Sequence, residues 1–203
     1  MIEEYWLAEF LLDASTGPAA VAIDVGANAG SWSRELAAVF GEVVALEPDY
    51  RARECFRLRG MPVNCTLLPF AAGAMPAVER FRLREGHEQS SLVDTHPVGA
   101  GGMRPSEVVD VREVSVVTLD QIAALYRWPR VDFVKIDVEG SEADVLAGVT
   151  SDVFRDTKFL IELHDTDRAT GLQLERLGRD KIKIAPHPHA KAHPKHKWVY
   201  STP

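Results

Sequence analysis

The chain has 203 residues, of which 46% are hydrophobic and 26% are charged, a composition typical of one globular domain with a sizeable core. Its formal net charge of -7 argues against a nucleic-acid partner, which usually requires a broad basic face, and favours a small-molecule substrate. No apolar run is long enough to span a membrane, and the first ten residues, MIEEYWLAEF, are acidic rather than signal-like, so we expect no membrane partner.

Residues 1–19 and 21–25 contain the first two predicted elements. Aromatic and aliphatic side chains recur at helical spacing in the first segment, which predicts an N-terminal helix packed against the domain or over the mouth of its ligand site. The second segment, VAIDV, is a short apolar run and predicts a buried strand.

A glycine turn, GANAG, follows this strand and leads into a helical pattern. Gly26 and Gly30 allow positive φ angles, and Asn28 is the side chain that best tolerates them. A dinucleotide fingerprint would need glycine at the positions of Asn28 and Ser31, so a pyrophosphate is disfavoured. The carboxylate and amine of S-adenosylmethionine suit the turn better, with Asp24 as the acid that pairs with the amine. An ordinary glycine turn is the alternative.

The second predicted strand, 42–46, ends in Glu47, about 20 residues after Gly26. An acid at this place in a βαβ unit accepts hydrogen bonds from ribose hydroxyls. Pro48 fixes the turn that aims Glu47, although a surface glutamate is the alternative. The next helix is predicted over 48–58, with arginines on a solvated outer face.

Cys55 and Cys65 lie ten residues apart, on that helix and on a third predicted strand, 63–68. Their spacing matches no zinc motif, so we expect two buried free thiols. Free thiols suit a reducing compartment, and we expect a cytoplasmic protein.

The segment after the third strand, PFAAG, places Phe70 and Ala71 where the topology would hold an adenine ring. Residues 78–84 and 108–117 then alternate in polarity, which predicts a hairpin. Residues 84–107 between them are rich in glycine, proline and serine and have no periodicity. Such long loops are either lids or disordered, and we favour a substrate lid.

Thr118 begins the next predicted helix. Its spacing from Gln121 is that of a capping box, in which each side chain bonds the backbone of the other residue. Leu119, Ile122 and Leu125 form the predicted buried stripe.

The sequence RVDFVKIDVEGSE predicts a fourth strand, 131–136, that ends in Asp137. A turn through Glu139 then enters a helix with Ser141 as its cap and Asp144 three residues later. Ligands bind outside the carboxyl ends of strands in open α/β sheets, so Asp137 lies where a reacting group is expected.

A fifth strand begins at Phe159, and its alternation puts Glu162 and His164 on one face. His164 is the candidate general base, because its ordinary pKa suits proton transfer at neutral pH, and Asp137 or Glu162 would orient it. A structural histidine at the strand end is the alternative. A Mg²⁺ ion bound by Asp137 and Glu162, with His164 as a further ligand, is also left open.

The last predicted elements are a helix over 172–177 and a hairpin of 181–184 with 198–201. The connection between the two hairpin strands, 186–197, is rich in histidine and lysine. Its prolines and irregular spacing favour a solvated basic loop over a metal site.

Six motifs together resemble the FkbM family of S-adenosylmethionine-dependent methyltransferases: AIDVGANAGSWS, VVALEPD, SSL, VVTLD, VDFVKIDVEGSEADVLAGV and FLIELH. The resemblance covers roughly residues 20–165, and KIDVEGSE is its most specific part. It implies an α/β, Rossmann-like class I methyltransferase fold, in which helices cover both faces of a seven-stranded, mostly parallel sheet. Residues 1–203 would form one domain. Family members typically O-methylate hydroxyls of secondary metabolites or sugars.

The resemblance also implies the roles of individual residues. The methionine part of the cofactor would lie on the glycine turn, the ribose on Glu47, and the reactive methyl beside Asp137. The predicted cofactor contacts are Asp24, Gly26, Ala27, Asn28, Gly30, Ser31, Glu47, Pro48, Phe70, Ala71 and Asp137. The predicted acceptor contacts are Ser90, Ser91 and Glu139, and the predicted catalytic residues are His164, Asp137 and Glu162.

Two other functions are compatible with the same residues. A nicotinamide oxidoreductase is weakened by the missing fingerprint glycines, and a non-catalytic S-adenosylmethionine-binding module would bind the cofactor without turnover. We expect a small-molecule acceptor. Its identity is left open, because the lid would determine which acceptor the protein prefers. The oligomeric state is left open.

Overall fold

The computed structural model describes residues 17, 19–86, 90–92, 106–164, 167–179, 181–186 and 197–202. The predicted N-terminal helix, most of the predicted lid and the loop rich in histidine and lysine lie outside these residues. Within the described ranges, no helix is long and apolar enough to cross a membrane.

The main sheet has seven strands in the order β3-β2-β1-β7-β8-β10-β9. Their bounds are β1 Val21–Val25, β2 Glu42–Leu46, β3 Cys65–Leu68, β7 Phe133–Ile136, β8 Lys158–Leu163, β9 Lys181–Pro186 and β10 Lys197–Thr202. β10 is antiparallel to β8 and to β9, and the other neighbouring pairs are parallel. The predicted seven-stranded, mostly parallel sheet is confirmed. Because the strand order reverses between β1 and β7, a ligand crevice is expected at their carboxyl ends.

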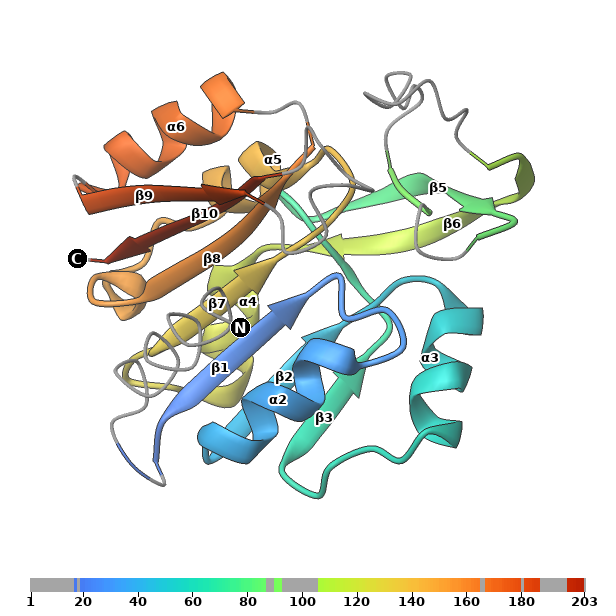
Figure 1. The fold of residues 1–203 in the computed structure, drawn as a ribbon, viewed down its shortest axis with the longest axis horizontal. Helices are drawn as coiled ribbons and strands as arrows, with labels where there is room; N and C mark the ends of the chain where they lie inside the picture. The colour runs from blue at the N-terminus through green and yellow to red at the C-terminus, as the bar shows by residue number, and fades with distance from the viewer. Residues whose placement is uncertain are drawn as a thin grey trace.

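Helices pack on both faces of this sheet, as predicted (Figure 1). They are α2 Ser31–Val39, α3 Tyr50–Leu58, α4 Leu119–Tyr126, α5 Glu142–Ala147 and α6 Asp167–Arg176, with a short 3₁₀ turn at Asp152–Phe154. One apolar core joins the sheet to α4, α5 and α6, and the other joins it to α2 and α3. Alternate side chains of the strands enter the two cores, which is why every residue of β1 and β7 is buried.

A second, three-stranded sheet stands beside the carboxyl ends of the main sheet (Figure 1). It contains β4 Ala71–Ala72, β5 Ala77–Arg84 and β6 Val108–Val117, in the order β4-β6-β5. β5 and β6 are antiparallel, so the predicted hairpin is confirmed. The short β4 follows β3, the edge strand of the main sheet, and pairs with β6. It therefore connects the two sheets.

α4 confirms one local prediction and corrects another. Thr118 and Gln121 form the expected capping box, with both side-chain-to-backbone hydrogen bonds present at 3.1 Å. Leu125, however, is 66% exposed, and Ala123 takes its place in the buried stripe. The buried face follows the spacing of three and four residues through Leu119, Ile122 and Ala123, which turns Leu125 toward solvent.

Three smaller predictions also need correction. Pro48 precedes α3 rather than beginning it, because Asp49 is the N-cap. The side chain of Ser141 makes no capping hydrogen bond, and the Glu142 carboxylate instead accepts from the Gly140 N–H at 2.9 Å. Cys55 is only half-buried, whereas both it and the buried Cys65 are free thiols as expected.

Candidate cofactor and acceptor site

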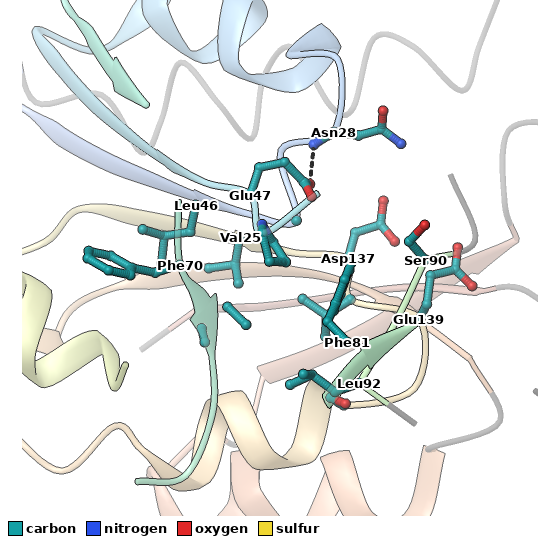
Figure 2. A pocket seen from close by; sticks show the side chains of 16 residues that line it. Val25, Asn28, Leu46, Glu47, Phe70, Phe81, Ser90, Leu92, Asp137 and Glu139 are labelled. Atoms are coloured by element: carbon teal, nitrogen blue, oxygen red, sulfur yellow. Dashed lines mark hydrogen bonds between the residues drawn. The ribbon is translucent and has the colours of Figure 1, made fainter. Parts of the chain in front are cut away.

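A pocket opens at the carboxyl ends of β1, β2 and β7, where the strand order reverses (Figure 2). Its volume is about 570 Å³ when the open mouth is counted. It is lined by Val25, Gly26, Asn28, Leu46, Glu47, Pro48, Phe70, Ala71, Ala72, Phe81, Ser90, Leu92, Asp137, Val138, Glu139 and Ser141.

The two ends of the pocket differ in character (Figure 2). Val25, Leu46 and Phe70 gather at one end, which we call the apolar end. Asp137 and Glu139 lie at the other, which we call the acidic end. A ligand with an aromatic group at one end and a cationic or hydroxylated group at the other would match this division.

The glycine turn has the backbone that the sequence predicts. The φ angles of Gly26, Asn28 and Gly30 are 74°, 49° and 77°. A Cβ atom on Gly26 would collide with the backbone oxygen of Asp137, and one on Gly30 would collide with the Phe56 ring. These glycines therefore allow the turn to pack against its own protein, and this packing places Asn28 and the end of β7 on one pocket.

Glu47 lies buried in the pocket wall, between the apolar and acidic ends. Its Oε2 accepts the N–H of Asn28 at 2.8 Å, and its Oε1 accepts the N–H of Asp49 at 2.7 Å. Burial raises the pKa of Glu47 to about 7, although the two N–H donors oppose this rise. The carboxylate is thus held in place and titrates near neutral pH.

Lys135 lies behind the acidic end and is 1% exposed. Its Nζ is 3.2 Å from Asp137 Oδ2, 3.4 Å from Asp24 Oδ1 and 3.2 Å from the backbone oxygen of Gly26. Burial by itself lowers the pKa of Lys135, but the charges of Asp137 and Asp24 outweigh it and hold this pKa above its ordinary value. Lys135 therefore joins the ends of β1 and β7 as a permanent cation.

Asp24 is placed differently from the prediction. It is fully buried, it does not line the pocket, and its Oδ2 accepts the Ser33 hydroxyl at 2.6 Å. Because side chains alternate along β1, Val25 faces the pocket while Asp24 faces Lys135 and α2. The pairing of Asp24 with a cofactor amine stays a prediction, and in this structure its side chain contacts Ser33 and Lys135.

His164 follows β8 and lies among carboxylates, as the spacing of FLIELH predicts. Its Nδ1 is 2.8 Å from Glu142 Oε1. Its Nε2 is 3.6 Å from Glu139 Oε1, 3.8 Å from Asp137 Oδ1 and 3.8 Å from Glu162 Oε1. Ligand atoms of Asp137, Glu162 and His164 lie within 4.8 Å of one another, so these three side chains could hold a metal ion.

The expected ordinary pKa of His164 is wrong. Burial lowers this pKa, but the hydrogen bond to Glu142 and the charges of Glu139 and Asp137 outweigh burial and raise it to about 10. The surrounding carboxylates therefore stabilise the protonated imidazole, which disfavours His164 as the general base in the protein without ligands. His164 also stands behind Asp137 and Glu139 rather than in the pocket lining.

The other predicted site residues divide into two groups. Those that line the pocket, besides Glu47, are Gly26, Asn28, Pro48, Phe70, Ala71, Asp137, Ser90 and Glu139. Those that do not, besides Asp24 and His164, are Ala27, Gly30, Ser31, Ser91 and Glu162. Ser91 is 1% exposed and pairs with the backbone of Arg82, which turns it away from the pocket.

One described stretch of the predicted lid, 90–92, is tied to the start of α3. The Ser90 hydroxyl donates to Asp49 Oδ2 at 3.1 Å. The Arg51 guanidinium bonds the same Asp49 carboxylate at 2.7 Å and the backbone oxygen of Arg84 at 2.7 Å. Arg51 therefore connects the helix to the pocket rim, whereas the sequence predicted a solvated arginine face.

Sequence reasoning missed several residues of the site. Lys135 was detectable, because it is a lone charge in an otherwise apolar strand. Glu142 is the completely buried acid that contacts His164, and it looked like an ordinary first-turn helix residue. Phe81 and Leu92 reach the pocket only through the second sheet, and no local pattern marks them.

A comparison with known protein families identifies the family of this chain. Residues 24–183, more than half of the chain, match the methyltransferase FkbM domain. The chain belongs to the FkbM methyltransferase family. The match begins at Asp24 beside the glycine turn and includes the ends of all three strands that form the pocket. It also means that the pocket belongs to an S-adenosylmethionine-dependent methyltransferase.

Solved structures share the fold of this FkbM domain at low sequence identity. The methyltransferase FkbM of Methylobacillus flagellatus KT has 18% identity and a TM-score of 0.59, over 91% of this chain and 44% of that one. The present chain thus spans less than half of that relative. The precorrin-8w decarboxylase of Methanobacterium thermoautotrophicum has 16% identity and a TM-score of 0.55, over 100% of this chain and 90% of that one. The chain matches no curated protein in sequence.

A third structure supports the same class of fold. The precorrin-6y C5,15-methyltransferase of Geobacter metallireducens GS-15 has 14% identity and a TM-score of 0.53, over 96% of this chain and 87% of that one. The FkbM domain therefore has the Rossmann-like class I methyltransferase fold.

The pocket of this FkbM domain fits S-adenosylmethionine on its own geometry. The apolar end offers Phe70 and Ala71 to an adenine ring, and the buried Glu47 offers carboxylate oxygens to ribose hydroxyls. Asp137 and Glu139 supply negative charge where the cationic sulfonium would lie. These residues come from the loops after β1, β2, β3 and β7, which meet at the reversal of strand order.

Proposed function

We propose that this FkbM domain transfers a methyl group from S-adenosylmethionine to a hydroxyl of a small molecule. The observation that carries the proposal is the division of one pocket into an apolar end beside Glu47 and an acidic end at Asp137 and Glu139. The first end suits the adenosine of the donor, and the second suits its sulfonium and an acceptor with hydrogen-bond donors.

In the proposed complex, the adenine lies against Phe70 and the ribose hydroxyls donate to Glu47. Each Glu47 oxygen accepts one backbone N–H and keeps a further lone pair for a hydroxyl. The methionine part extends along the glycine turn toward Asp137. Its sulfonium charge is then stabilised by the carboxylates of the acidic end.

The reaction moves one methyl carbon from sulfur to oxygen. The S–C bond breaks as the C–O bond forms, and sulfur keeps the electron pair and becomes a neutral thioether. The acceptor hydroxyl loses its proton, which we assign to a carboxylate of the acidic end, because Asp137 and Glu139 line the pocket there. Holding the two reactants in line and excluding water is the main contribution of the protein.

The chemistry of the chain favours a small acceptor over a nucleic acid. The net charge is -7, and the acceptor side of the pocket carries Asp137 and Glu139, which would repel phosphates. The free thiols of Cys55 and Cys65 fit a cytoplasmic location.

Two linked measurements test this function. Calorimetry with S-adenosylhomocysteine should show binding by the parent and by the exposed control Glu113→Gln, and no comparable binding of NADH. Methyl-labelled S-adenosylmethionine with a metabolite extract should then give an alkali-stable labelled ether. Binding of NADH instead, or cofactor binding without transfer to any acceptor, would overturn the proposed function.

A further inference from the structure

The side chains of Asp137, Glu162 and His164 converge behind the acidic end of the pocket. They come from three places in the chain, namely the loop after β7, strand β8 and the residue that follows it. Their ligand atoms all lie within 4.8 Å of one another, and Glu162 and His164 are buried. We propose that these three side chains bind one divalent transition-metal ion, for which Mn²⁺ is the best match.

The distances within the cluster are compatible with one ion that contacts all three side chains. Nε2 of His164 is 3.8 Å from Asp137 Oδ1 and 3.8 Å from Glu162 Oε1. Both separations are too long for direct hydrogen bonds. An ion with ligands at about 2.1 Å holds neighbouring ligand atoms roughly 3 to 4 Å apart, so the observed spacing needs little rearrangement.

The orientation of the imidazole provides a separate argument. Glu142 is on α5, is 0% exposed, and its Oε1 lies 2.8 Å from Nδ1 of His164. An ionised carboxylate only accepts hydrogen bonds, so Nδ1 keeps its proton, and Nε2, which would release its own proton when a metal ion binds, is directed at Asp137 and Glu162. Metal-bound histidines in proteins are typically oriented in this way by a carboxylate on the other ring nitrogen.

The charges around the cluster also favour a cation. Asp137, Glu139, Glu142 and Glu162 all lie within 4 Å of the imidazole of His164. Lys135 is shared between Asp137 and Asp24, so its single charge is divided between two carboxylates. A divalent ion would offset the remaining negative charge.

The ligand set distinguishes between ions. Mg²⁺ prefers oxygen ligands and retains its waters, whereas an imidazole beside two carboxylates suits a first-row transition ion that also accepts oxygen. We therefore replace the Mg²⁺ that the sequence left open at Asp137 and Glu162 with Mn²⁺. Asp137 also lines the pocket, so the ion would adjoin the acceptor and lower the pKa of its hydroxyl. This last role rests on the proposed function.

The test uses the full chain, freed of metals by a chelator, with Mn²⁺ as the probe. Electron paramagnetic resonance should show one ion bound per chain, and spin-echo modulation should show a directly bound nitrogen. Mn²⁺ should bind at least about tenfold more tightly than Mg²⁺. Glu162→Gln and His164→Gln should abolish binding, and Glu142→Gln should weaken it by about 10 to 100 fold.

Glu113→Gln is the matched control, because this glutamate is exposed on β6, and it should bind Mn²⁺ like the parent. Absence of Mn²⁺ binding at millimolar concentration would overturn the proposal, and so would bound Mn²⁺ without nitrogen modulation. If a variant does not fold, the spectrum of the parent protein still tests the proposal, because both of these outcomes are measured on the parent. S-adenosylhomocysteine binding, measured without metal, separates the proposals: its failure counts against the proposed function, whereas failure of Mn²⁺ counts against the metal site.

Discussion

Beside the apolar end of the pocket, Glu47 is held by two backbone N–H groups, whereas at the acidic end Asp137 pairs with Lys135 and Glu139 faces His164. Backbone donors are fixed by the turn and do not depend on any other side chain. At the acidic end the carboxylates share the charges of Lys135 and His164, so removing either cation leaves further negative charge uncompensated. Single substitutions at the acidic end should therefore affect stability and turnover, and those at the apolar end should mainly affect cofactor affinity.

The largest expected effect is that of Lys135→Met. It leaves Asp24 and Asp137 without their shared cation, and breaking a buried ion pair in this way typically costs about 3 to 5 kcal/mol. Urea denaturation would measure the loss in free energy of unfolding. The control Arg155→Met removes an exposed ion pair with Asp152 and should cost less than about 1 kcal/mol. Equal free energies of unfolding for the two variants would contradict the role of Lys135 as the shared cation of Asp24 and Asp137.

His164→Ala should lower turnover by roughly 10 to 100 fold, because the imidazole acts only through Asp137, which it adjoins and which lines the pocket. The affinity for S-adenosylhomocysteine should stay nearly constant, because His164 does not line the pocket. Steady-state kinetics together with calorimetry would measure both quantities. A variant that keeps its turnover would make His164 a structural residue only.

Glu47→Ala should weaken cofactor binding by about 1.5 to 3 kcal/mol, the range for hydrogen bonds to a charged group. The effect should appear as lower affinity for S-adenosylhomocysteine in calorimetry, with little loss of turnover at saturating cofactor. Unchanged affinity would place the ribose elsewhere in the pocket.

The smallest effect is a pH dependence of cofactor affinity. The pKa of Glu47 is about 7, because burial raises it, and the ribose hydroxyls should bind its ionised form. As the pH falls through 7 the carboxylate becomes protonated, so affinity should decrease about tenfold between pH 8 and pH 6. Calorimetry at both pH values would measure this change, and Glu47→Gln should abolish it. A flat profile in the parent would contradict the assignment.

The same contrast explains what the sequence could predict. The glycine turn and Glu47 follow from local rules, since backbone conformation and the end of a strand determine where they lie. The proximity of Asp137, Glu162 and His164 also followed, from strand alternation and the meeting of strand ends at one edge of the sheet.

The differences from these predictions arose where tertiary packing determines the chemistry. Asp24 looked like a ligand residue because it stands beside the turn, but Lys135 and Ser33 engage it from the opposite face. His164 was assigned an ordinary pKa because neither Glu142 nor Glu139 is near it in the chain. A pKa depends on the charges that surround a group in space, which local sequence patterns do not specify.

A crystal structure of the chain with S-adenosylhomocysteine tests the account most directly. We predict that the adenine lies against Phe70, that both ribose hydroxyls donate to Glu47, and that the sulfur faces Asp137. Adenosine bound at the acidic end, or ribose hydroxyls without contact to Glu47, would contradict the assignment of the two ends of the pocket.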